Sequence, residues 1–214
     1  MIPIILKIKK ETHKSIAQAQ DVIIQELYRV FDAAVFHGGT AIWRCYGGNR
    51  FSEDIDVYMP RSLNKIEMLF ANLEKRGFIV QKKKISEHSL YSSLLWERTS
   101  VRLEAVFKTV SGHLKEYQAV EGNLMTVYTL FPEEFIAEKV SAYLDWRKIR
   151  DLYDIFFLLR FVGNAAAVRQ PLDRLKTQFK PPLDEKELKV LILEGLVPTS
   201  KKMIEYIINL PWAK

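Results

Sequence analysis

Residues 36–42 read Phe-His-Gly-Gly-Thr-Ala-Ile, and residues 54–57 read Asp-Ile-Asp-Val. The first stretch places a glycine pair between the end of an apolar strand pattern and the start of a helical one. Glycine lets the backbone approach a ligand closely, and the free amides of a helix N-terminus attract anions. We therefore expect Gly38, Gly39 and Thr40, with the Thr40 hydroxyl, to form a phosphate cradle.

The second stretch carries paired carboxylates. Asp54 and Asp56 are two positions apart, and residues two apart in a strand project from the same face. Carboxylate oxygens are the ligands that Mg²⁺ or Mn²⁺ prefers, and such an ion can bridge a triphosphate during in-line displacement. The pattern predicts a metal site at Asp54 and Asp56. The alternative is a tight turn with two solvated acids.

A third acid is expected from another strand. Residues 101–107 alternate between apolar and polar side chains, with Arg102 and Glu104 on the polar face. If this strand lies beside Asp54 and Asp56 with its polar face turned the same way, Glu104 can bind the metal or accept a proton from an attacking hydroxyl.

Composition excludes several classes of protein. The 214 residues are 48% hydrophobic, with 9 Gly and 8 Pro, which rules out a disordered or collagenous chain. Cys45 is the single cysteine, so no internal disulfide and no cysteine zinc site can form. The longest apolar stretch, residues 155–162, is interrupted by Arg160 and is too short for a membrane span. We expect a cytoplasmic protein that does not associate with membranes.

The net charge of +6 is concentrated in two places. One is formed by Lys7, Lys9, Lys10 and Lys14, and the other by residues 82–84, which are all lysine. A polyanionic partner is one interpretation of these clusters, and solvated surface lysines are the other.

Changes in periodicity divide the chain into two parts and predict an α+β fold. The first part should hold a mixed sheet with flanking helices, and the second, which begins with Pro132 as a first-turn residue, should be helical. We therefore expect domains at 1–131 and 132–214. Expected helices are 16–31, a short one ending at 46, 63–75, 132–147, 150–161, 165–178, 184–193 and 200–208. Expected strands are 33–36, 55–59 and three or four between 78 and 129.

Two charged residues of the helical part need an explanation. Lys139 falls within an apolar helix stripe, where it either extends past the edge of the core or enters a cleft to meet an anion such as triphosphate. Asp151 either caps the next helix or orients Lys139 or Arg150. His37 is interpreted as a packing residue, whereas Arg44 and Arg50 can serve either at a phosphate or at the surface.

These motifs resemble a known family. The runs at 36–42 and 50–57 are similar to the first motif of AbiEii-type nucleotidyltransferases, toxins of the DNA polymerase beta-like superfamily. Residues 132–139 and 150–155 are similar to the C-terminal motifs of that family. Glu104 stands where the superfamily at large has an aspartate.

The resemblance implies a nucleotidyltransferase-like catalytic domain over 1–131. In it Asp54 and Asp56 would bind metal, Lys139 would contact nucleotide phosphate, and Asp151 would complete the active centre. Arg50 and Ser52 belong to the first motif and would bind nucleotide. The resemblance also implies transfer from a nucleoside triphosphate, with structured RNA such as tRNA as the acceptor in some members, and pairing with an antitoxin protein.

Our favoured hypothesis is therefore a Mg²⁺-dependent nucleotidyltransferase acting on RNA as the toxin of a toxin–antitoxin pair. One alternative keeps the site but takes a small-molecule acceptor, as antibiotic-modifying enzymes do. The other is a nucleotide-binding or protein-binding module that has lost catalysis.

Overall fold

The computed structural model describes residues 3–210 and has the expected α+β fold. The chain forms two compact units. The first contains the chain up to Gly47 together with Phe51–Leu130, and the second contains Gly48–Arg50 and the chain from Phe131 onward.

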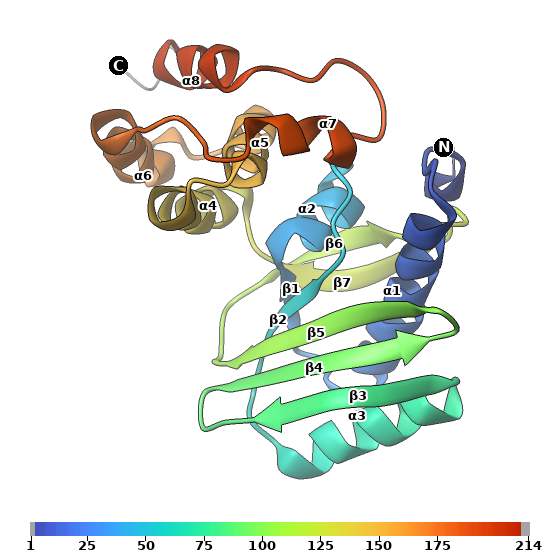
Figure 1. Ribbon diagram of the computed structural model, residues 1–214. Helices are drawn as coiled ribbons and strands as arrows, with labels where there is room; N and C mark the ends of the chain where they lie inside the picture. Colours follow the sequence, from blue (N-terminus) through green and yellow to red (C-terminus); the bar gives the residue numbers. More distant parts are fainter. Residues whose placement is uncertain (1–2, 211–214) are drawn as a thin grey trace. The chain divides into compact units, whose positions relative to one another are not determined.

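The first unit is built on one seven-stranded mixed sheet with the order β3-β4-β5-β2-β1-β7-β6 (Figure 1). Its strands are β1 (Val35–His37), β2 (Ile55–Met59), β3 (Phe78–Ile85), β4 (Ser89–Trp96), β5 (Thr99–Phe107), β6 (His113–Gln118) and β7 (Leu124–Thr129). Strand β2 pairs antiparallel with β1 and parallel with β5, so it lies in the interior of the sheet. This position brings the end of β1, the start of β2 and the middle of β5 side by side.

The expectation of three or four strands between residues 78 and 129 was wrong, since the structure has five there. Strand β6 is hard to recognise in the sequence. Its residues His-Leu-Lys-Glu-Tyr-Gln include one fully buried side chain, Tyr117. It is an edge strand, so most of its side chains face solvent and the apolar signal is weak.

Three helices belong to the first unit: α1 (Glu11–Val30), α2 (Gly38–Tyr46) and α3 (Leu63–Lys75). Helix α1 begins at Glu11, earlier than expected, because its first turns are polar and carry no apolar period. Lys14 donates to Glu11 over 2.8 Å in that turn. The buried face of α1, which includes Ile23, Ile24 and Leu27, packs in the core.

The second unit is helical. Its helices are α4 (Pro132–Trp146), α5 (Ile149–Leu158), α6 (Ala165–Gln178), α7 (Leu188–Leu191) and α8 (Ser200–Ile208), with 3₁₀ turns at Leu159–Phe161 and Glu185–Glu187. None of the helices within residues 3–210 is long and apolar enough to cross a membrane.

The single helix expected over 184–193 is instead a 3₁₀ turn followed by the four residues of α7. The helix stops because the next residues pair with a remote segment of the same unit. Ile192 forms a β-bridge with Arg50, and the amide of Leu193 donates to the carbonyl of Asn49 over 3.0 Å. Local periodicity carries no signal of such a partner.

Candidate active site

The backbone of Gly38 lies against the carboxylate of Asp56. Gly38 ends the turn from β1 into α2 with a φ of 74°, in the left-handed region that favours glycine. A β-carbon at this position would overlap Oδ2, Cγ and Cβ of Asp56. The glycine is therefore required twice, by its backbone angle and by the acid beside it.

Helix α2 begins at Gly38, so the amides of Gly38, Gly39 and Thr40 are the first-turn donors that have no partner within a helix. The side chain of Thr40 has another task. It is fully buried, and its hydroxyl donates to the backbone carbonyl of Asp54. This corrects the expectation that the hydroxyl faces phosphate: Thr40 fixes the chain that carries Asp54.

The three candidate carboxylates lie on neighbouring strands. Asp54 immediately precedes β2, Asp56 is within it, and Glu104 is the register partner of Asp56 on β5. Burial raises the pKa of Glu104, the negative charge of Asp56 raises it further, Arg102 opposes the rise, and Asp54 adds to it. Mutual repulsion of this kind is relieved by a cation.

Arg102 is a member of this cluster that the sequence placed only on the polar face of its strand. Its Nε donates to Oδ1 of Asp54 over 2.7 Å, and its Nη2 donates to Oδ2. Nη1 lies 3.8 Å from Oε1 of Glu104. The fork-shaped contact with Asp54 balances part of the negative charge at this edge of the carboxylate cluster.

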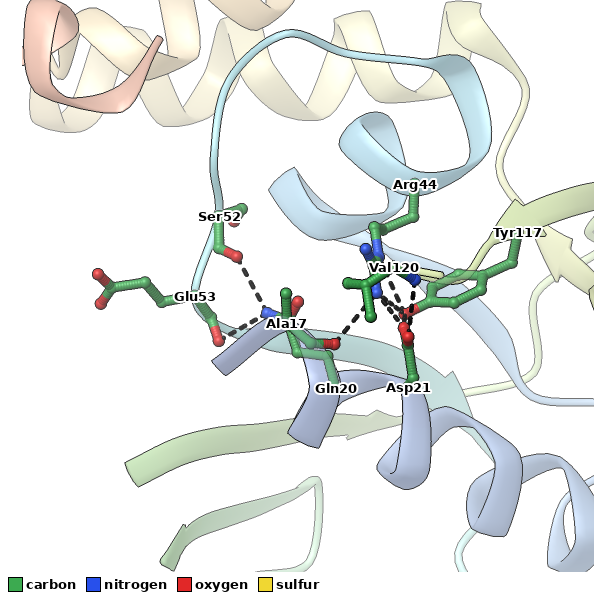
Figure 2. Close-up of polar contacts among 8 residues, drawn as sticks. All are labelled: Ala17, Gln20, Asp21, Arg44, Ser52, Glu53, Tyr117 and Val120. Atoms are coloured by element: carbon green, nitrogen blue, oxygen red, sulfur yellow. Dashed lines mark hydrogen bonds and ion pairs between the residues drawn. The ribbon is translucent and has the colours of Figure 1, made fainter. Parts of the chain in front are cut away.

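Gln20 binds the backbone of the segment directly before Asp54. This residue is fully buried on α1, and its Nε2 donates to the carbonyls of Ser52 and Glu53 over 3.0 and 2.9 Å (Figure 2). Ser52, expected to bind nucleotide, thus has its carbonyl engaged, whereas its side chain is partly exposed. Gln20 interrupts the apolar stripe of its helix at a spacing of four from Ile16 and Ile24, and this was the signal that could have revealed it.

A buried ion pair lies next to Gln20. Arg44 is 2% exposed and contacts the carboxylate of Asp21 and the hydroxyl of Tyr117, as Figure 2 shows. Asp21 also accepts from the Tyr117 hydroxyl over 2.7 Å and from the Val120 amide over 2.8 Å. Arg44 therefore joins α1, α2 and β6 in the core, and it serves neither a phosphate nor the surface.

His37 also has a packing role, as expected from the sequence. Its ring stacks on that of Tyr58 with centroids 3.8 Å apart and planes 4° from parallel. The ammonium of Lys108 lies 4.4 Å from the Tyr58 centroid, so the three side chains form one stack at the end of β2.

A second charged cluster lies within the second unit. Lys139 on α4 donates to Oδ1 of Asp151 over 2.9 Å and lies 3.0 Å from Oδ2 of Asp154, both on α5. Arg50 donates to Asp154 from Nε over 2.8 Å and from Nη2 over 2.7 Å. Two cations thus face two carboxylates, and the cluster is formally neutral.

Burial and pairing act in opposite directions on these groups. Burial disfavours the charged form of Asp154, but Arg50 and Lys139 outweigh it and hold the pKa of Asp154 below its ordinary value. Burial likewise opposes the charge of Lys139, and the neighbouring Asp154 and Asp151 carry its pKa above its ordinary value. Both groups are therefore charged at neutral pH.

The second cluster bears on three expectations. The side chain of Asp151 accepts from Lys139, and the amide of Ile149 at the start of α5 donates to Asp184 over 2.7 Å, so Asp151 does not cap that amide. Lys139 does not extend into solvent. Arg50 was expected at the nucleotide, but it is 5% exposed and its guanidinium is engaged by Asp154, so it belongs to the interior of the second unit.

Comparison with known proteins agrees with these motifs. The family model described as nucleotidyl transferase AbiEii toxin, type IV toxin–antitoxin system, matches residues 25–198. The chain belongs to the AbiEii family. It is therefore a nucleotidyltransferase of a toxin–antitoxin family. No curated protein sequence gives a significant match to the chain.

Solved structures show the same fold as this AbiEii chain. JHP933 from Helicobacter pylori is 18% identical with a TM-score of 0.64, over 92% of this chain and 89% of that one. MenT4, a nucleotidyltransferase toxin from Mycobacterium tuberculosis, is 20% identical with a TM-score of 0.60, over 94% and 87%. The likeness therefore extends over both units of the chain.

The side chains of the carboxylate cluster in the AbiEii chain are suitable ligands for a divalent ion, but they are not arranged around one ion position. Within residues 3–210 no three Asp, Glu, His or Cys side chains are arranged as ligands of one ion, and Asp54 is turned to Arg102. The donors fit nevertheless, because Asp54, Asp56 and Glu104 offer hard oxygen atoms, and the charges of both aspartates raise the pKa of Glu104.

Proposed function

We propose that the protein transfers a nucleotide from a nucleoside triphosphate to a hydroxyl of an RNA acceptor, with Mg²⁺ or Mn²⁺ held by Asp54 and Asp56. The observation that carries the proposal is the contact of Gly38 with Asp56, whose register partner is Glu104. A backbone turn that opens a helix and three carboxylates thereby lie together at the start of β2, beside the middle of β5. Phosphate oxygens and a divalent ion are the ligands that this combination suits.

In this proposal the first-turn amides of α2 bind the triphosphate, and Gly38 lets this turn lie directly against the carboxylate of Asp56. Gln20 and Thr40 hold residues 52–54, so that the carboxylate of Asp54 is positioned before substrate binds. A bound Mg²⁺ would polarise the α-phosphorus and neutralise charge on the leaving pyrophosphate.

Glu104 is the proposed proton acceptor. The acceptor hydroxyl forms a bond from its oxygen to the α-phosphorus, and the bond from that phosphorus to the oxygen bridging the β-phosphate breaks. Pyrophosphate leaves with that electron pair, and the hydroxyl proton passes to Glu104. Its raised pKa makes Glu104 a better base than an ordinary glutamate.

The second unit would contribute Lys139, which the family resemblance assigns to nucleotide phosphate, and Asp151, which orients its ammonium. Membership of a type IV toxin–antitoxin family supports an antitoxin protein as partner. The exposed lysines of β3 favour RNA over a small molecule as the acceptor, since polyanions bind through such groups.

The test is incubation with labelled triphosphates, Mg²⁺ and total RNA. Asp54→Ala and Asp56→Ala should each abolish transfer of label while leaving the far-UV circular dichroism unchanged. The matched control is Glu74→Ala, an exposed acid on α3 of the same unit, which should transfer as the wild type does. Lys139→Ala should weaken nucleotide binding, measured by calorimetry.

Three outcomes would contradict the proposal. Undiminished transfer by Asp54→Ala would remove the metal site from the mechanism. Label transferred at the same rate with and without RNA would identify a small-molecule acceptor, and triphosphate binding without turnover on any acceptor would identify a module that has lost catalysis.

A further inference from the structure

One face of the sheet carries a row of functional side chains that runs from the carboxylates to the β3 edge. His37 pairs with Asp56, Asp56 with Glu104, Glu104 with Tyr91 and Tyr91 with Lys84, each on the next strand of the sheet. Directly paired residues project from the same face. With strands about 5 Å apart, Tyr91 is about 10 Å from Asp56 and Lys84 is about 15 Å from it.

A second row runs beside the first and adds further polar groups. Arg102 pairs with Ser93, and Ser93 pairs with Lys82. The ammonium of Lys82 lies 5.0 Å from the centroid of the Tyr91 ring. The surface thus places an aromatic ring beside two lysines, next to the carboxylates.

The three consecutive lysines of β3 do not act as one cluster, because successive side chains of a strand point to opposite faces, and a β-bulge decides which of them share the face of Tyr91. The register shifts between Val80 and Lys82, which leaves Gln81 as the extra residue. Lys82 and Lys84 then share the face of Tyr91. Lys83 points to the other face, where it pairs with Glu67 of α3 over 2.8 Å and lies 4.8 Å from the Phe70 ring centroid.

Within the first unit the helices cover the opposite face of these strands. Alternate residues of β5, Val101, Leu103 and Ala105, are buried on the side where α1 contacts β5 and α3 contacts β3, whereas Arg102 and Val106, which alternate with them, are exposed. Figure 1 shows β3, β4 and β5 facing the viewer with α1 passing behind β5. The row from Asp56 to Lys84 therefore lies on the face that these two helices leave free.

We propose that this face binds the single-stranded segment of RNA that leads to the acceptor hydroxyl. Tyr91 stacks on a base, and Lys82 and Lys84 contact phosphates. A flat surface that alternates an aromatic ring with amines is what single strands require, since every base offers a face for stacking and every linkage a charge. The proposal rests on the proposed function and states where its acceptor lies.

The test is fluorescence anisotropy with a short labelled single-stranded RNA of mixed sequence, without triphosphate or metal, over a range of salt concentrations. Lys82→Gln/Lys84→Gln should lower the slope of log Kd against log salt by about 1.4, since each phosphate contact on a single strand contributes about 0.7. Tyr91→Ala should weaken binding by about tenfold with the slope unchanged, and Tyr91→Phe should retain it, because a phenyl ring still stacks.

Two controls change lysines elsewhere, and the second of them matches the loss of two charges. Lys83→Gln alters the same lysine run on the other face, and Lys9→Gln/Lys10→Gln removes two exposed lysines from the N-terminal cluster. Both should keep the wild-type slope. Thermal unfolding of every variant verifies that the sheet is intact.

A wild-type slope in Lys82→Gln/Lys84→Gln would overturn the proposal, as would an equal loss in either control. Preference of the wild type for duplex RNA, with no effect of Tyr91→Ala on binding, would also overturn it. Because binding is measured without transfer, these results are independent of the reaction. If the wild type labels RNA and Lys82→Gln/Lys84→Gln does so with unchanged KM, the proposed function stands and this surface is wrong.

Discussion

Gly38 leaves no space for a β-carbon beside the carboxylate of Asp56. Gly38 is the first residue of α2 and Asp56 lies in β2, and Cα of His37, directly before the glycine, is the register partner of Asp56. The glycine turn is therefore shaped around the acid, and a change at one residue must displace the other.

Gly38→Ala should lose nucleotidyl transfer, because the new methyl group displaces the carboxylate of Asp56. The control is Gly47→Ala at the end of α2. Gly47 has a φ of 68°, but no neighbouring side chain or backbone lies within 4 Å of the place that a methyl group would take, so this change costs only the backbone strain, about 1 kcal/mol. Measured rates of transfer and thermal unfolding separate the two effects. Equal activity losses in both variants would show that the contact with Asp56 is irrelevant.

Gln20→Met should loosen residues 52–54 without unfolding the protein. The change removes two hydrogen bonds to backbone carbonyls, but it also removes Oε1, a buried atom that has no hydrogen-bond partner within the described part of the chain. The net effect on the free energy of unfolding should stay within about 1 kcal/mol. Hydrogen exchange at residues 52–56 should become faster and transfer slower. Gln25→Met, at an exposed position of the same helix, should change neither.

Arg102→Gln should increase the affinity for a divalent ion in the absence of nucleotide, because the guanidinium competes for the carboxylate of Asp54. The Arg102 side chain is 46% exposed, so the ion pair is worth about 0.2–1 kcal/mol and the gain should be at most about fivefold. Titration with Mn²⁺ followed by electron paramagnetic resonance measures it. Arg98→Gln, in the exposed turn between β4 and β5, should bind Mn²⁺ as the wild type does. Weaker binding in Arg102→Gln would mean that Arg102 positions the carboxylate for the ion.

Asp154→Asn should destabilise the protein by about 3–5 kcal/mol at neutral pH, because Arg50 and Lys139 would lose a buried counter-charge. The pKa of Asp154 is lowered from 3.8, so its contribution is complete above that value and is lost as pH falls through the lower pKa of the folded state. The difference between variant and wild type in urea unfolding should therefore shrink below about pH 4. Glu205→Gln on the exposed face of α8 should change stability by less than about 0.5 kcal/mol. A difference that stays constant with pH would indicate a packing effect alone.

Much of the fold followed from local patterns. Strand β2 and helices α3 and α6 have the expected limits, because their alternation or 3.6-residue period is strong and turn residues bound them. The alternation of β5 also placed Glu104 on the polar face of its strand, and the observed register brings that residue beside Asp56.

What the sequence left hidden depends on partners that are distant along the chain. Arg50 stands in a motif beside Asp54, yet its counter-charge is Asp154, 104 positions away. The bulge at Gln81, which decides whether Lys82 or Lys83 shares the face of Tyr91, arises only when β3 pairs with β4. Periodicity within a segment cannot report either relationship.

Gly48–Arg50 belong to the second unit, although the residues on both sides of them in the sequence belong to the first. Residues 131–214 separated from the rest of the chain would hold Asp154 without the arginine that neutralises it, and Leu193 without the carbonyl of Asn49. The helical unit is thus not encoded by one continuous stretch of the gene, and a gene fragment that begins after Leu130 yields an incomplete unit.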